Sequence, residues 1–86
     1  MEEIIEKLTR IFSERFPGSV AELEKSEFVE RVGGSLMWSG FDMVEQIDRQ
    51  RQVSRAVREG LTPEEQHKVA PILTFTPEEV ASIREG

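Results

Sequence analysis

The chain has 86 residues, 37% hydrophobic and 33% charged, and its 17 acidic against 11 basic residues give a net charge of −6. This length predicts one domain, residues 1–86, with a single two-layer core and no room for an enclosed substrate cavity. The acidic balance disfavours binding to nucleic acids, and the lack of cysteine excludes disulfides, thiolate metal sites and cysteine nucleophiles.

The first residues lack the features of a targeting segment. Met1-Glu2-Glu3 is the reverse of the basic start of a signal peptide. No apolar run approaches the roughly 18 residues of a membrane span. Together with the lack of cysteine, these features predict a soluble cytoplasmic domain.

An amphipathic helix is predicted before Pro17, which cannot continue it. The apolar residues that helical spacing places on one stripe are Ile4, Ile5, Leu8, Ile11, Phe12 and Phe16. This stripe predicts the face that enters the core.

A β-hairpin is predicted next. Residues 20–25 alternate apolar and charged side chains, which is typical of a half-buried edge strand. A second strand is predicted from residue 29 or 31 to residue 39. Within it, Gly33-Gly34 indicates a bulge or a close backbone approach.

The central element is an amphipathic helix after the second strand. Asp42 stands where it can cap this helix, with Glu45 in capping-box spacing, and Gly60 stands where a left-handed C-terminal stop is expected. The apolar residues that can face the sheet are Ile47, Val53, Val57 and Leu61. Positive charge is concentrated on the same helix at Arg49, Arg51, Arg55 and Arg58.

One tetrapeptide occurs twice in the last third of the chain, as Thr62-Pro63-Glu64-Glu65 and Thr76-Pro77-Glu78-Glu79. Each copy places Thr at a helix cap, Pro at the first helical position and Glu where it can reach back. The first copy predicts a short helical turn and the second a C-terminal helix through Arg84. Residues 69–75 between them predict a buried strand, at a sheet edge because Pro71 has no N–H to donate.

The predicted order is therefore helix, strand, strand, helix, short helix, strand, helix. The link from the second to the third strand through the central helix predicts a right-handed crossover between parallel strands. We expect an α+β fold, a two-layer sandwich with a three-stranded mixed sheet.

This order and two local patterns resemble the BolA family. Phe41 followed by Arg49-Gln50-Arg51-Gln52-Val53-Ser54-Arg55-Ala56-Val57 is similar to the family's Phe-x-Gly…Arg-His-Arg-x-Val-x-x-x-Leu helix. Ile72-Leu73-Thr74-Phe75-Thr76-Pro77-Glu78-Glu79 is similar to its last strand and closing Thr-Pro-x-Glu. The resemblance implies a BolA-like fold, arranged like a class II KH domain. It also implies partnership with a monothiol glutaredoxin in iron–sulfur metabolism and, in some members, transcriptional regulation.

The resemblance also implies a ligand set for a [2Fe–2S] cluster shared with the glutaredoxin. The family's ligand His before the last strand falls on Lys68 here, and His67 is one residue away. The family's second ligand, a Cys or His between the first two strands, has no counterpart in residues 25–31. The middle His of Arg-His-Arg is Gln50, and the Gly after Phe41-Asp42 is Met43. His67 is thus the candidate metal ligand, and the alternative is a solvated loop histidine.

The candidates for partner binding are Arg49, Arg51, Lys68 and Trp38. The arginines suit an acidic partner or, in a regulatory member, DNA; the alternative is a solvated face paired with neighbouring acids. Trp38 suits an exposed patch, and the alternative is a place in the core. The loop Gly60-Leu61-Thr62-Pro63 lacks the Gly-x-x-Gly of KH domains, so nucleic-acid binding is not expected.

The sequence leaves three functions open. The first is a cluster-handling adaptor that partners a glutaredoxin. The second is a divergent protein-interaction module or homodimer subunit without a cluster, reached through Trp38 or the edge strands. The third is a transcription regulator. We do not expect an enzyme, since no Ser/His/Asp arrangement, phosphate loop or metal-spaced cluster is present.

Overall fold

The first helix inserts its apolar stripe into the core. The computed structural model describes residues 2–85, and helix α1 spans Glu2–Arg15, before Pro17 as predicted. The stripe residues with almost no exposed surface are Ile4, Leu8, Phe12 and Phe16. The remaining two, Ile5 and Ile11, are half-buried and pack against the same core.

Three strands form one mixed sheet in the order β1-β2-β3. β1 (Val20–Lys25) pairs antiparallel with β2 (Val32–Met37), and β2 pairs parallel with β3 (Val69–Phe75). The predicted hairpin, the parallel pairing and the edge position of β3 are confirmed. The predicted second strand was too long at both ends. Residues 29–31 belong to the hairpin loop, and Ser39 belongs to a short 3-10 helix.

The predicted irregularity at the paired glycines is confirmed. The pairing of β2 with β3 shifts register between Val32 and Gly34. Gly34 has φ +148°, and a Cβ at this position would lie 1.9 Å from the carbonyl oxygen of Glu22. Only glycine therefore allows β1 and β2 to approach this closely.

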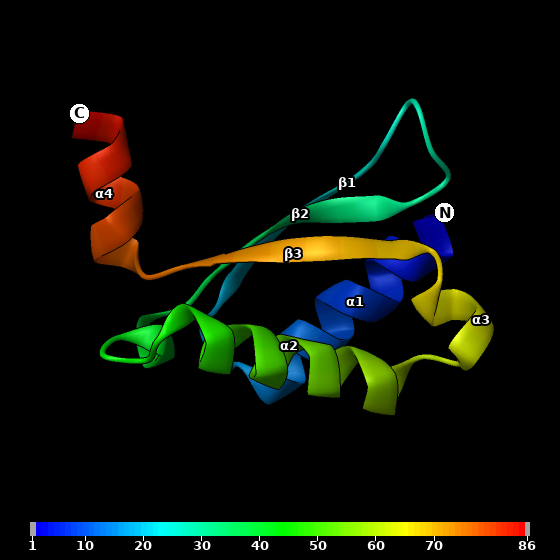
Figure 1. Ribbon diagram of the computed structural model, residues 1–86, viewed down its shortest axis with the longest axis horizontal. Coiled ribbons are helices and arrows are strands. Elements are labelled where there is room, and N and C mark those ends of the chain that lie inside the picture. The colour runs from blue at the N-terminus through cyan, green and yellow to red at the C-terminus, as the bar shows by residue number, and fades with distance from the viewer. Residues whose placement is uncertain (1, 86) are drawn as a thin grey trace.

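Helices cover one face of the sheet. Figure 1 shows α1 and α2 (Gln46–Gly60) on the same side, with α3 (Pro63–Gln66) leading into β3 and α4 (Pro77–Glu85) standing at the far end of that strand. The buried apolar residues from beyond α1 are Val32, Leu36, Phe41, Val53, Ala56, Val57, Leu61 and Ile72. No helix within residues 2–85 is both long enough and apolar enough to cross a bilayer.

The start of α2 differs from the prediction. The N–H of Asp42 donates to Ser39 O at 3.0 Å, closing a short 3-10 helix, η1 (Ser39–Phe41). Met43 then adopts φ 64°, and α2 begins at Gln46 with Glu45 at its N-cap. The predicted capping role of Asp42 is wrong because this residue ends the preceding turn. Glu45 makes no side-chain capping bond.

The end of α2 also differs. Gly60 is the last helical residue, and the extended Leu61 that follows ends the helix, so the predicted left-handed stop at Gly60 is wrong. A Cβ on Gly60 would lie 2.4 Å from Cδ1 of Ile11. The glycine thus serves the packing of α1 against α2 rather than a turn.

Both copies of the repeated tetrapeptide form capping boxes, as predicted. Thr62 Oγ1 accepts from the N–H of Glu65, whose carboxylate accepts the N–H of Thr62. Thr76 and Glu79 make the same pair of bonds at the start of α4, at 3.2 and 2.8 Å. The sequence signal for these two helix starts is therefore reliable.

Candidate functional site

The turn between α3 and β3 carries the predicted metal ligand. His67 and Lys68 are both exposed and lie immediately before the strand. The backbone of Lys68 is held on both sides, since its N–H donates to Glu65 O at 2.9 Å and its carbonyl accepts from Val32 N at 2.8 Å. The turn is therefore fixed while both side chains face solvent.

His67 offers one ligand to a metal. Among residues 2–85, no group of three or more His, Cys, Asp or Glu side chains is placed to hold a metal ion. A structural metal site usually needs about four ligands. Within these residues, His67 could therefore contribute one ligand to a metal.

Arg49 lies inside the protein and not on the predicted docking surface. It is 5% exposed. Its Nε donates to Val44 O at 2.7 Å, and its Nη1 donates to Glu79 Oε1 at 2.7 Å. The guanidinium carbon lies 5.8 Å from the centre of the Phe41 ring, within reach of a cation–π contact. These contacts give Arg49 a structural role between α2 and α4.

The spacing of α2 could have revealed this burial. Arg49 lies four residues before Val53 and eight before Val57, so all three share one face of the helix. Ile47, predicted to face the sheet, is 59% exposed instead. Ile47 lies off the face shared by these three residues. The arginine is tolerated inside because none of the buried side-chain nitrogens among the described residues lacks a hydrogen-bond partner.

The other arginines of α2 remain on its surface. Arg51 is exposed and lies 3.7 Å from Asp48, one helical turn earlier. Arg55 and Arg58 are also exposed. Of the two arginines predicted to bind a partner, the structure thus leaves Arg51 available at the surface.

Trp38 belongs to the core-facing aromatic cluster. Its indole N–H donates to Pro17 O at 2.8 Å, and its ring packs edge-on against Phe16 and Phe41, with centroids 5.1 Å apart in each case. The side chain is half-buried. The structure favours the core alternative over an exposed patch.

Two glutamines of α2 donate hydrogen bonds to carbonyl groups on the free edge of β3. This role was not predicted from the sequence. Gln50 donates to Ile72 O at 3.0 Å, and Gln46 donates to Thr74 O at 3.3 Å. Alternate carbonyls of an edge strand point away from the sheet, so these side chains satisfy the unpaired side. Gln50 stands where the resemblance expects the family's middle His. Its amide suits this capping role.

Three carboxyl groups are held ionised by partners on other helices. A hydrogen bond from Arg49, followed by the backbone N–H of Thr76, holds the pKa of Glu79 below its usual value. Lys7 of α1 and the N–H of Thr62 lower the pKa of Glu65 in the same way. Each repeated tetrapeptide therefore joins a short or terminal helix to a core helix.

The third carboxyl joins the two core helices. Arg15 donates to Glu59 at 2.7 Å, linking the end of α1 to the end of α2. This bond lowers the pKa of Glu59, and the nearby charges of Arg55 and Arg58 lower it further. Both partners are exposed, so salt will weaken the pair.

The chain matches none of the protein families, curated proteins or solved structures with which it was compared. Its resemblance to BolA proteins rests on the two local patterns and on the order of elements. The features of the chain that bear on function are therefore the turn before β3 and the exposed surfaces.

Proposed function

We propose that this chain is a BolA-like adaptor domain that partners a monothiol glutaredoxin in iron–sulfur cluster metabolism. The order of helices and strands supports this, since it is the order on which the resemblance rests. The chain acts by binding another protein and catalyses no reaction of its own.

The exposed His67 in a fixed turn is the observation that carries the proposal. The glutaredoxin holds the [2Fe–2S] cluster, and His67 supplies one neutral imidazole to it. Lys68 beside it and Arg51 on α2 supply positive charge to an acidic surface of the partner. Charge complementarity of this kind speeds association more than it raises affinity.

Visible circular dichroism of a [2Fe–2S]-loaded monothiol glutaredoxin tests the proposal. Titration with the wild-type protein is expected to change the cluster spectrum, and titration with His67→Ala is not. Lys68→Ala is the matched control, because it removes the adjacent exposed side chain and leaves the imidazole. A spectrum unchanged by the wild type, or changed equally by His67→Ala, would contradict cluster sharing.

A second candidate function is a protein-interaction module that has lost the cluster. It is favoured by Lys68 at the family's ligand place and by the loop of residues 25–31, which holds neither Cys nor His. This function predicts a complex with a partner that forms without metal and is unaffected by His67→Ala. Size-exclusion chromatography with and without a chelator separates the two functions.

Regulation of transcription is the least supported function. It needs a set of arginines on one exposed face, and the burial of Arg49 removes one of them. Binding to DNA is strongest at low salt. Failure to retard a DNA duplex at low ionic strength would exclude it.

A further inference from the structure

Within residues 2–85, α1 and α2 leave the second face of the sheet uncovered, and only α4 borders it, at one end. Residues on β1 and β3 whose side chains point away from α1 and α2 are exposed, among them Val20 at 48% and Leu73 at 60%. α4 stands at one end of this face (Figure 1) and presents Ile83, which is 64% exposed. Large exposed apolar side chains gathered on one face mark an interaction surface more often than scattered ones do.

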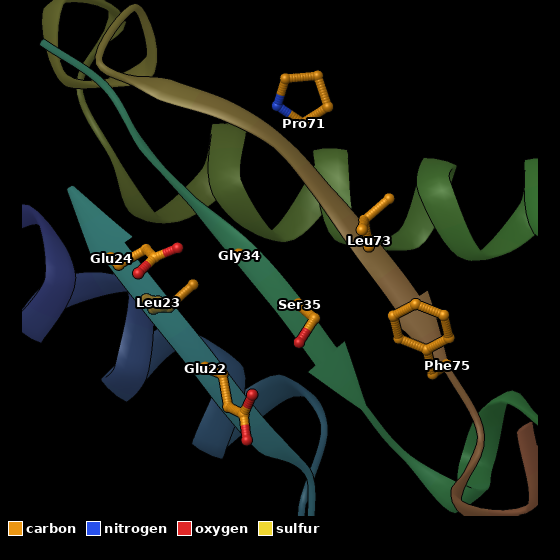
Figure 2. Close-up of a pocket in the computed structure, with 8 residues that line it drawn as sticks. All are labelled: Glu22, Leu23, Glu24, Gly34, Ser35, Pro71, Leu73 and Phe75. Atoms are coloured by element: carbon orange, nitrogen blue, oxygen red, sulfur yellow. The ribbon is translucent and has the colours of Figure 1, made fainter. Parts of the chain in front are cut away.

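Figure 2 shows this face as a groove with two unlike walls. Glu22 and Glu24 rise from β1 on one side, and Pro71, Leu73 and Phe75 rise from β3 on the other. The floor is the central strand, where the small residues are Gly33, Gly34 and Ser35. One wall is therefore acidic and the other is apolar. The floor carries only small side chains or none.

The groove continues to the inner side of α4. Glu22, Ser35 and Phe75 line both this groove and the hollow next to it. The residues that extend the apolar lining toward α4 are Val20, Met37, Val80 and Ile83. Arg84 of α4 also lines this hollow. The acidic side chains that line the groove and the hollow are those of β1, Glu22 and Glu24.

The dimensions fit an α-helix. The two walls stand on strands that are two positions apart, which separates them by roughly 10 Å. An α-helix with its side chains is about 10–12 Å across. A helix lying along β2 would therefore rest on the side chains of both walls at once.

We infer that this groove binds an amphipathic α-helix of a partner protein, with an apolar stripe against Leu73 and Phe75 and lysines or arginines against Glu22 and Glu24. Within residues 2–85 neither glutamate forms an ion pair, so both carboxylates are available to such cations. The net charge of −6 opposes a second copy of this chain as the occupant. The partner helix is therefore basic.

A fluorescein-labelled designed peptide tests this inference by fluorescence anisotropy. The probe is an 18-residue helix with one leucine stripe and an adjacent lysine stripe, and its control carries glutamate in place of lysine. The lysine peptide is expected to bind and the glutamate peptide is not. Leu73→Ser is expected to weaken binding about tenfold. Ile47→Ser on α2 is the matched control, since Ile47 is 59% exposed and lies outside the groove.

A second pair of variants separates the acidic wall from the overall charge. Glu22→Gln with Glu24→Gln is expected to weaken binding about tenfold or more. Glu6→Gln with Glu14→Gln on α1 changes the net charge equally and is expected to have little effect.

Three results would overturn the inference. One is equal weakening by the two double variants, and another is absence of binding by the lysine peptide. The third is a dimer in solution that Leu73→Ser dissociates, because a second copy would then cover the groove.

Discussion

Nη1 of Arg49 lies 2.7 Å from Oε1 of Glu79, and this bond joins a side chain that is 6% exposed to one that is 43% exposed. The same carboxylate oxygen accepts the N–H of Thr76 at 2.8 Å, so one glutamate caps α4 and neutralises the buried arginine. Glu79 therefore takes part both in the start of α4 and in the attachment of α4 to α2.

Arg49→Ala is expected to lower the free energy of unfolding by about 2 kcal/mol. The substitution removes the donors to Val44 O and to Glu79 and leaves a cavity. The loss is smaller than the roughly 3–5 kcal/mol of a fully buried pair, because the exposed Glu79 can be hydrated. Urea denaturation followed by the fluorescence of Trp38, the one tryptophan, measures it. Arg51→Ala, on the surface of the same helix, is expected to stay within about 0.5 kcal/mol of the wild type; an equal loss would refute the structural role of Arg49.

Stability is expected to fall in acid. The pKa values of Glu59, Glu65 and Glu79 are each lowered from a usual value of 4.5 by partners in the folded state. A lowered folded-state pKa contributes stability above the unfolded-state pKa, and that contribution disappears as the pH falls through the folded-state value. The melting temperature should therefore be flat near neutral pH and decline below about pH 4.5.

Glu79→Gln tests the share of one carboxyl in this decline. The variant is expected to be less stable at neutral pH and to show a shallower fall in acid, because it has one linked proton fewer. Glu78→Gln is the matched control, since Glu78 is exposed and forms none of these bonds. Identical pH profiles for the two variants would contradict the assignment.

Gly34→Ala is expected to destabilise the protein by roughly 3 kcal/mol or more, or to prevent folding. The new Cβ would meet the backbone of Glu22 at 1.9 Å, and a strand backbone cannot move aside as a side chain can. Gly18→Ala separates this clash from backbone strain. Gly18 has φ +83° with no atom within 4 Å of a Cβ, so its substitution should cost about 1–2 kcal/mol. Thermal melting compares the two variants. Equal losses of stability would show that the Gly34→Ala variant relieves its clash with the backbone of Glu22.

Trp38→Phe is expected to lower the free energy of unfolding by about 1 kcal/mol, which is the usual worth of one hydrogen bond. The ring contacts with Phe16 and Phe41 are largely kept, while the bond to Pro17 O is lost. Trp38→Ala also removes the ring and should cost about 3 kcal/mol. Far-ultraviolet circular dichroism in urea measures both. A negligible effect of Trp38→Ala on the free energy of unfolding would contradict the core role of Trp38.

The sequence predicted those elements whose signal is local. Alternation of apolar and charged residues defined β1, and the two tetrapeptides defined the starts of α3 and α4. The start of α2 could not be found in this way, because Asp42 is equally suited to end a 3-10 turn and to begin a helix. The left-handed Met43 carries no sequence signal, since residues of this type rarely adopt that conformation.

The candidate surfaces were harder to predict, because they depend on contacts between distant elements. The pairing of Arg49 with Glu79 joins residues thirty positions apart. The groove between β1 and β3 was not predicted, because which face of the sheet the helices cover is a tertiary property. The exposure of His67 did follow from its polar turn.

The glutamines on the edge of β3 have a consequence for how copies of the sheet could join. Fibres that grow by strand addition need a receptive border on each side of every subunit. Gln46 and Gln50 already occupy two carbonyls on one border, so a new strand would have to displace both side chains to pair there. Strand addition would then be possible only at the opposite border, β1. Association through β1 would end at a pair of subunits and would not extend into a fibre.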